Sequence, residues 1–130
     1  WYVPSLHKSL NGEWQFNLDW KPKSMPFVQL CFVHAIAEAQ KEIHQGVRLT
    51  IPTLIMHSHQ TKFPKKWGLD AQTSDVILDV KDMTDNAKKM QGDVQTLAVQ
   101  NGLHDLVLSA PPVRKQVYQD LFAWLKQKIA

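Results

Sequence analysis

Two residues capable of acid–base chemistry lie in the second half of the chain, one in a turn after a short apolar run and one at the end of an earlier loop. His104 lies in the turn at residues 101–106 (NGLHDL), and Asp75 ends an earlier loop. In open α/β sheets, ligands bind beyond the carboxyl ends of the strands, where such turns lie. A carboxylate that binds one imidazole nitrogen fixes the tautomer of the ring and leaves the other nitrogen free to take a proton. We therefore predict that His104 is a general base and that Asp75 orients it.

Alternatives to both assignments remain open. Asp70, Asp79 and Asp82 lie close to Asp75 in the sequence and are rivals for the role of the acid. Asp79 follows an apolar run and could face outward, whereas Asp82 has the position of a helix N-cap. For His104 the alternative is a turn histidine whose nitrogens bind backbone groups. We favour Asp75 and expect its carboxyl within hydrogen-bond reach of His104, because parallel strands bring the two loops to one edge of the sheet.

The nucleophile that such a pair would serve is missing from the chain. The order Asp then His matches the last two members of a Ser, Asp, His order. No Gly-x-Ser-x-Gly occurs, however, and no serine lies on a glycine-flanked turn from strand to helix; the serines are at positions 5, 9, 24, 58, 74 and 109. There is also no glycine-rich phosphate loop. We expect the isolated chain to be inactive on esters.

Two further histidines lie together at the end of an apolar run. His57 and His59 are two residues apart, so their rings would point to the same side of a strand and could bind a metal ion. Only His104 could add a third ligand, whereas zinc sites use three or four protein ligands. We therefore expect no metal and no cofactor. Three histidines have no companions and are expected to be structural: His7, His34 and His44.

Length and composition predict one folded unit that comprises residues 1–130. The 130 residues are 44% hydrophobic, enough for a single core. No stretch reaches the roughly 18 apolar residues of a membrane span, and the N-terminus lacks the pattern of a signal peptide. Cys31 is the single cysteine, and its apolar neighbours predict a buried, inert thiol. We expect a cytoplasmic protein with no membrane span.

The basic charge balance does not indicate a nucleic-acid partner. The net charge is +3 and the pI is about 9.0, but Lys and Arg are spread along the chain with acidic residues nearby. The densest cluster, residues 62–67 (KFPKKW), mixes cations with aromatic side chains, as single-strand binders do. Pro64 and Gly68 mark it as an irregular connection, so a solvated loop is the favoured interpretation.

The first third of the chain predicts an arm and a helix. Within residues 1–26, apolar and polar residues alternate over 14–20, which is the period of a half-buried strand or an extended arm. Residues 27–46 carry apolar side chains at helical spacing and end at Gly46. The apolar face of this helix is wide, so we expect it to pack in the interior.

Residues 47–130 predict a βαβα unit with parallel strands. Residues 53–56 form a nearly continuous apolar run, typical of a strand buried on both faces. A helix over 82–91 and a second strand over 94–99 follow. A final helix begins at residues 111–112 (PP) and carries one apolar stripe.

Several segments resemble the C-terminal part of an α/β-hydrolase. They are residues 52–58 (PTLIMHS), 74–80 (SDVILDV) and 102–109 (GLHDLVLS). The family that they resemble is the bacterial serine hydrolases of the lysophospholipase-like kind. Upstream, residues 5–8 (SLHK), 12–14 (GEW) and 20–22 (WKP) are similar to the segment that these proteins carry before their last strands.

The resemblance implies an α/β fold that is a partial α/β-hydrolase fold: the last parallel strands of the sheet with flanking helices, preceded by an extended arm. It implies that Asp75 is the family's acid and His104 its general base, with a serine outside this chain and a small-molecule carboxylic ester as substrate. His59 departs from the family, which often has Asp there. The N-terminal half with its nucleophile elbow is absent. Because the chain begins with Trp1 rather than Met, we expect upstream sequence to have been lost.

A second interpretation is a non-catalytic binding or interaction domain on a degenerate hydrolase scaffold, since fold alone does not settle function. In either case the expected partner is the missing N-terminal half. The isolated chain is expected to self-associate through an unpaired sheet edge or through the arm at residues 14–20. The residues that contact substrate are not identified by the sequence.

Overall fold

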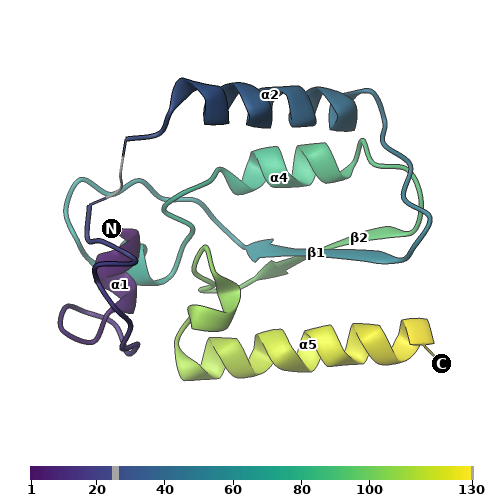
Figure 1. Cartoon of the computed structure of the whole chain (residues 1–130). Coiled ribbons are helices and arrows are strands. Elements are labelled where there is room, and N and C mark those ends of the chain that lie inside the picture. The colour runs from purple at the N-terminus through teal and green to yellow at the C-terminus, as the bar shows by residue number, and fades with distance from the viewer. Residues whose placement is uncertain (25–26, 130) are drawn as a thin grey trace.

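A computed structural model of the chain describes residues 1–24 and 27–129. Figure 1 shows helices stacked on a small central sheet. The elements in chain order are α1 (Tyr2–Leu6), α2 (Leu30–His44), β1 (Thr53–Ser58), α3 (Leu69–Gln72), α4 (Val80–Ala87), β2 (Val94–Val99), the 3₁₀ turn η1 (Leu106–Leu108) and α5 (Pro111–Ile129).

The sheet consists of β1 and β2, which run parallel with Thr53 opposite Val94 and Ser58 opposite Val99. Helix α4 connects them and lies on one side of the sheet, and α5 lies on the other side (Figure 1). The predicted order of strand, helix, strand and helix is confirmed. Both loops that follow the strands lie at the same edge of the sheet, which is where the candidate residues were expected.

The buried core lies between the sheet and α5. Val99, Leu106 and Val117 form its centre, and Met56 and Val113 pack against it. The prediction that residues 53–56 are buried on both faces is wrong, because all four are only half-buried. β1 and β2 pair only with each other in the described part of the chain, so water reaches the strands at the edges of the sheet.

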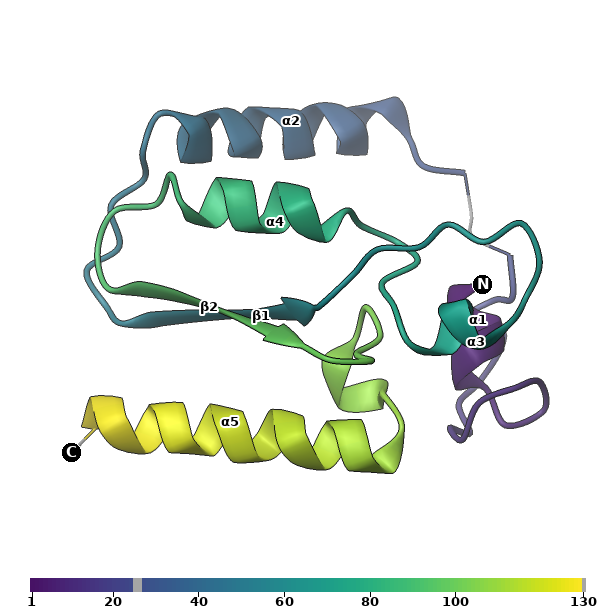
Figure 2. The same cartoon turned by 180° about the vertical axis from the view of Figure 1, so that it is seen from behind.

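Helix α2 forms within the predicted range 27–46, but the expectation that it packs in the interior is wrong. Ile43 is half-buried, and every other residue of the helix is exposed. Cys31 is also exposed, which contradicts the expected buried thiol. Figures 1 and 2 show α2 as the outermost layer, beyond α4, with none of the described elements on its far side. Its apolar residues, such as Phe32 at 59% exposure, therefore remain uncovered.

The N-terminal segment is not the extended arm that was predicted. It begins with the short helix α1 and turns back, so that His7 and Trp14 form an isolated bridge rather than a strand. The predicted alternation is visible in burial only in part, since Trp14, Phe16 and Leu18 are half-buried. Trp20, the last apolar residue of the pattern, is 88% exposed. The indole N–H of Trp14 donates to the carbonyl of Leu108 at 2.9 Å and so ties this segment to η1.

Helix α4 begins earlier than predicted. Asp79 is its N-cap, and the Asp79 carboxylate accepts a hydrogen bond from the backbone N–H of Lys81 at 2.9 Å. The assignment of Asp82 as the cap is therefore wrong, and Asp82 lies in the first turn of the helix. No helix in the described residues is both long and apolar enough to cross a membrane.

The turn of the N-terminal segment depends on one glycine. A Cβ atom on Gly12 would lie 2.0 Å from the backbone carbon of Leu6, which is far inside van der Waals contact. The backbone approaches this closely because the Trp14 N–H donates to the Leu6 carbonyl at 2.8 Å. Gly68, by contrast, has no atom within 4 Å of the position where a Cβ would lie.

We expect Gly12→Ala to lower the free energy of unfolding by about 2 kcal/mol, because the added methyl forces two backbone segments apart. Gly68→Ala is the matched control and is expected to change stability by less than about 0.5 kcal/mol. Urea unfolding followed by tryptophan fluorescence measures both. Equal effects of the two substitutions would contradict the close approach at Gly12.

Candidate active site

The structure brings His104 and Asp75 together. The Nδ1 atom of His104 lies 2.8 Å from Oδ2 of Asp75, so the predicted hydrogen-bond contact is confirmed. Asp75 is held beside the extension of β1, where it forms a parallel bridge with Thr61. Its backbone N–H donates to the Gln60 carbonyl and its carbonyl accepts from the Lys62 N–H, both at 3.0 Å. The parallel arrangement thus places the carboxylate next to the turn that follows β2.

Asp75 is a buried carboxylate that accepts three hydrogen bonds. Its side chain is only 1% exposed. Oδ1 accepts hydrogen bonds from the backbone N–H groups of Ile77 at 2.7 Å and Leu78 at 2.8 Å. Oδ2 accepts a hydrogen bond from Nδ1 of His104. Burial by itself raises the pKa of Asp75, but the hydrogen bonds from His104, Leu78 and Ile77 outweigh it and lower the pKa below its ordinary value. The group is therefore an anion at neutral pH.

The charge of Asp75 determines the tautomer of His104. An ionised carboxylate can only accept hydrogen bonds, so Nδ1 of His104 must carry the proton that it donates to Asp75. In the neutral ring Nε2 then bears a lone pair. Nε2 makes no hydrogen bond to any described residue, and the His104 side chain is 27% exposed. The imidazole is thus held at one nitrogen and available to a proton donor at the other.

Two buried serines hold the turn that carries His104. The Ser58 hydroxyl donates to the Gly102 carbonyl at 2.7 Å, and the Ser109 hydroxyl accepts the Leu103 N–H at 2.9 Å. Both serines are 1% exposed or less. Asn101 adopts a positive φ of 57°, a conformation that Asn tolerates better than most residues. Sequence reasoning considered these serines only as nucleophiles, and no local pattern marks the long-range bond of Ser58.

A second group of residues beside His104 comes from the N-terminal segment. The Tyr2 and His104 rings form a T-shaped contact, with 5.8 Å between their centroids and an angle of 84° between their planes. The Tyr2 hydroxyl donates to Asp105, and Lys21 Nζ donates to the same hydroxyl at 2.8 Å. Burial raises the pKa of Asp105 and lowers the pKa of Lys21. Sequence reasoning missed Tyr2 and Lys21, because their sequence distance from His104 gives no signal.

The rival residues have other roles. Asp79 caps α4, as described above, and the backbone carbonyl of Asp70 accepts a hydrogen bond from the Ser74 hydroxyl. His57 donates from Nδ1 to the Ser58 carbonyl at 2.6 Å, and His59 Nδ1 accepts the Asn101 N–H at 3.2 Å. Within the described ranges, no group of three His, Cys, Asp or Glu side chains could hold a metal ion.

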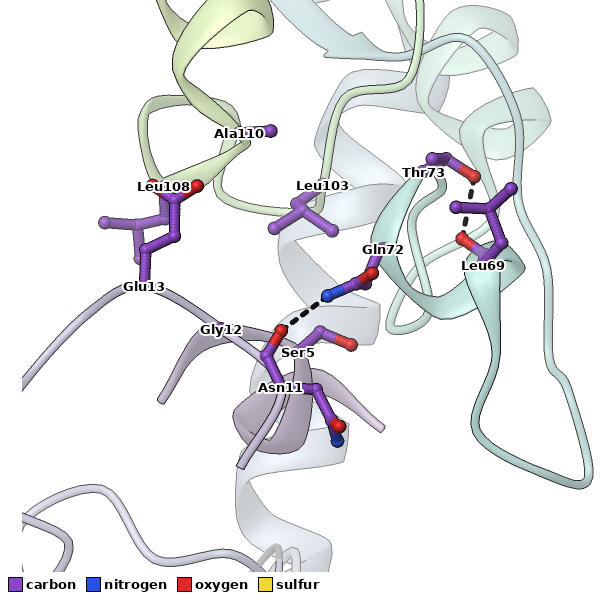
Figure 3. A pocket seen from close by; sticks show the side chains of 10 residues that line it. All are labelled: Ser5, Asn11, Gly12, Glu13, Leu69, Gln72, Thr73, Leu103, Leu108 and Ala110. Atoms are coloured by element: carbon purple, nitrogen blue, oxygen red, sulfur yellow. Dashed lines mark hydrogen bonds between the residues drawn. The ribbon is translucent and has the colours of Figure 1, made fainter. Parts of the chain in front are cut away.

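A cavity of about 290 Å³ lies between the N-terminal segment, α3 and the His104 turn (Figure 3). The turn contributes Leu103 to the lining of the cavity, and the residues after it contribute Leu108 and Ala110. The amide of Gln72 donates across the cavity to the Asn11 carbonyl at 2.5 Å. His104 is not one of the lining residues. A molecule bound in the cavity would therefore contact the residue next to His104 rather than its ring.

Comparison with known proteins gives no relative, since no family model, no curated protein and no solved structure matches this chain.

The hydrogen bond between Ser109 and Leu103 is expected to stabilise the His104 turn. Ser109→Ala leaves the buried N–H of Leu103 without an acceptor, so we expect the free energy of unfolding to fall by about 1–3 kcal/mol. Ser24→Ala, at an exposed position, serves as the control and should change it by less than about 0.5 kcal/mol. Chemical denaturation measures both. An unchanged stability of Ser109→Ala would mean that the bond to Leu103 is not formed.

The lowered pKa of Asp75 predicts a dependence of stability on pH. The folded protein releases this proton more readily than the unfolded chain, in which the ordinary value is 3.8. The stabilisation is therefore fully present above that value and is lost as the pH falls through the lower pKa of the folded state. We expect the wild-type protein to be more stable than Asp75→Asn at neutral pH, by an amount that shrinks below about pH 4. A difference that grows toward acid would contradict this assignment.

Proposed function

We propose that these residues are the C-terminal portion of a serine hydrolase that acts on carboxylic esters. The observation that carries the proposal is the partly exposed His104 side chain, which is bound through Nδ1 to a buried carboxylate and whose Nε2 has no hydrogen-bond partner among the described residues. This is the arrangement required of a general base and its orienting acid.

The proposed mechanism assigns one role to each residue. Nε2 of His104 takes the proton from a serine hydroxyl as the serine oxygen attacks the ester carbonyl. Asp75 stabilises the imidazolium that forms, because it faces the Nδ1 proton at 2.8 Å and is already ionised. His104 then gives the proton to the departing alkoxide, and the same base activates the water that releases the acid.

The nucleophile in this proposal lies outside the 130 residues. None of the serine hydroxyls in the described residues forms a hydrogen bond with His104, and Ser58 and Ser109 are committed to holding the turn. The resemblance to lysophospholipase-like hydrolases supports a serine on an elbow in a preceding segment. The small parallel sheet is compatible with the last strands of such a fold, and its unpaired edges are where further strands would add.

The uncovered surfaces support a partner for this chain. β1 and β2 pair only with each other in the described residues, and α2 exposes large apolar side chains such as Phe32 and Leu30. Surfaces of this kind recruit other chains. In the proposal the N-terminal half of the hydrolase covers them, and the isolated chain self-associates.

A binding domain without catalytic activity is the second candidate. The cavity in Figure 3 favours it, because the cavity lies beside the His104 turn but does not include the His104 ring. In that case a ligand would bind whether or not His104 can transfer a proton.

The two candidates are separated by kinetics in the longer polypeptide that the proposal requires, in which these residues follow a Gly-x-Ser-x-Gly segment. With p-nitrophenyl esters as substrates, we expect His104→Ala to lower kcat by at least ~10³-fold, as when one member of a cooperating triad is lost. Asp75→Asn should also lower kcat heavily, because it removes the anion that fixes the ring.

Asp79→Asn is the matched control, since Asn caps a helix about as well as Asp and should leave kcat nearly unchanged. Full activity of His104→Ala would exclude the proposed mechanism. A heavy loss in Asp79→Asn with little effect of Asp75→Asn would show that the wrong acid has been assigned.

A further inference from the structure

The N-terminal segment contains a second pair of histidine and hydroxyl groups. Nδ1 of His7 lies 2.8 Å from the hydroxyl oxygen of Ser9, and the backbone N–H of Ser9 donates to the same nitrogen at 3.1 Å. The other ring nitrogen, Nε2, lies 3.1 Å from the carbonyl oxygen of Phe16. A hydroxyl, a base and a group that orients the base are thus in contact, in the order that nucleophilic catalysis requires.

The partners of the His7 ring fix its tautomer. A backbone N–H can only donate, so Nδ1 must accept and carries no proton. A carbonyl oxygen can only accept, so Nε2 must carry the proton that it donates to Phe16. Both contacts require the same neutral tautomer. The lone pair of Nδ1 is therefore on the side of the Ser9 hydroxyl, where it can take the hydroxyl proton.

The surroundings hold His7 rigidly and leave Ser9 accessible. His7 is 8% exposed, and its ring packs edge-on against the Phe16 ring, with 4.8 Å between centroids. The His7 carbonyl accepts the N–H groups of Leu10 and Gly12, which fixes its backbone. Ser9 is exposed. Water can therefore satisfy the Ser9 N–H once Nδ1 has taken a proton.

A hollow of about 450 Å³ opens beside this pair. It is lined by His7, Lys8, Ser9, Gln15, Phe16 and Leu18. Phe16 and Leu18 offer apolar surface to a short acyl chain. Lys8 and Gln15 carry N–H groups that can donate to a carbonyl oxygen on which negative charge develops. The lining therefore suits a small, uncharged carboxylic ester.

We propose that Ser9 is a nucleophile activated by His7 and that it is acylated by small carboxylic esters. The Ser9 oxygen forms a bond to the acyl carbon as its proton passes to Nδ1 of His7. The carbon–oxygen bond to the alcohol then breaks, and the departing alkoxide takes the proton back from His7. Water attacks the acyl group on Ser9 with His7 again as the base, and releases the carboxylic acid and free Ser9.

This site goes beyond the function proposed for His104 and does not rest on it. It changes two expectations from the sequence, which gave His7 a structural role and the isolated chain no activity on esters. The sequence was searched for a serine flanked by glycines, whereas a local turn brings the Ser9 hydroxyl to His7. The alternative for the same contacts is a turn in which the hydroxyl only completes local hydrogen bonding.

Covalent labelling of the 130-residue chain tests the proposal. A fluorophosphonate reacts with activated serines by forming a phosphorus–oxygen bond and losing fluoride, and peptide mass spectrometry identifies the labelled residue. We expect Ser9 to be labelled at least ~100-fold faster than Ser24, since a positioned general base contributes 10²–10⁴-fold. Ser24 is exposed in the same segment and is the internal control.

His7→Phe keeps an aromatic ring against Phe16 and removes the base, so the Ser9 labelling rate should fall to that of Ser24. His34→Gln, on the exposed helix α2, is the matched histidine control and should leave the Ser9 rate unchanged. If His7→Phe fails to fold, the wild-type chain in urea supplies the comparison, and its Ser9 rate should also fall to that of Ser24.

Esters give an independent measurement. Incubation with p-nitrophenyl acetate should leave an acetyl group on Ser9 and release p-nitrophenol, and Ser9→Ala should abolish the acetylated peptide. Labelling of Ser9 and Ser24 at equal rates in the folded wild-type chain would overturn the proposal. Fast labelling of Ser9 that persists in a folded His7→Phe variant would also overturn the proposal. Because the label is located on Ser9, neither result bears on the function proposed for His104.

Discussion

The buried carboxylate of Asp75 joins the separate parts of the candidate site. It accepts three hydrogen bonds, one from the His104 ring and two from the backbone that leads into α4. A buried charge is tolerated only when it is paired and hydrogen-bonded, so the loop after β1 and the turn after β2 must both close around it. The same bonds lower the pKa of Asp75 and keep it ionised. The orientation of His104 follows from that charge.

The His104 turn is fixed from two directions. From the end of β1 and from the residue after η1, the buried hydroxyls of Ser58 and Ser109 bind the backbone of the two residues that precede the histidine. From the N-terminal segment, Trp14 binds the end of η1 and Tyr2 meets the ring itself. Such support restricts the ring to one orientation, which is what a base needs in order to meet a proton donor repeatedly in the same geometry. The N-terminal segment is thus part of the site's support, although the sequence marked it only as an arm.

Sequence reasoning predicted the parts of the fold that depend on local pattern and chain order. The apolar runs gave β1 and β2, the proline pair gave the start of α5, and parallel topology predicted the contact of Asp75 with His104. It failed to predict burial where burial depends on which other element covers a surface. The periodicity of α2 indicates a helix with an apolar face but not whether anything packs on that face. Tyr2 and Ser58 were missed for a related reason, because their partners lie far away in the sequence and follow only from the assembled structure.

In the candidate site, Asp75 holds a proton on Nδ1 of His104 and leaves Nε2 free to act as a base. The ¹⁵N chemical shifts of the two ring nitrogens, measured in the folded protein at a pH where the ring is neutral, report this directly. We expect a protonated Nδ1 and an unprotonated Nε2 in the wild-type protein. In Asp75→Asn we expect the opposite tautomer when the asparagine presents its amide N–H to the ring, since that group can only donate. A wild-type His104 with its proton on Nε2 would show that Asp75 does not orient the ring as a base.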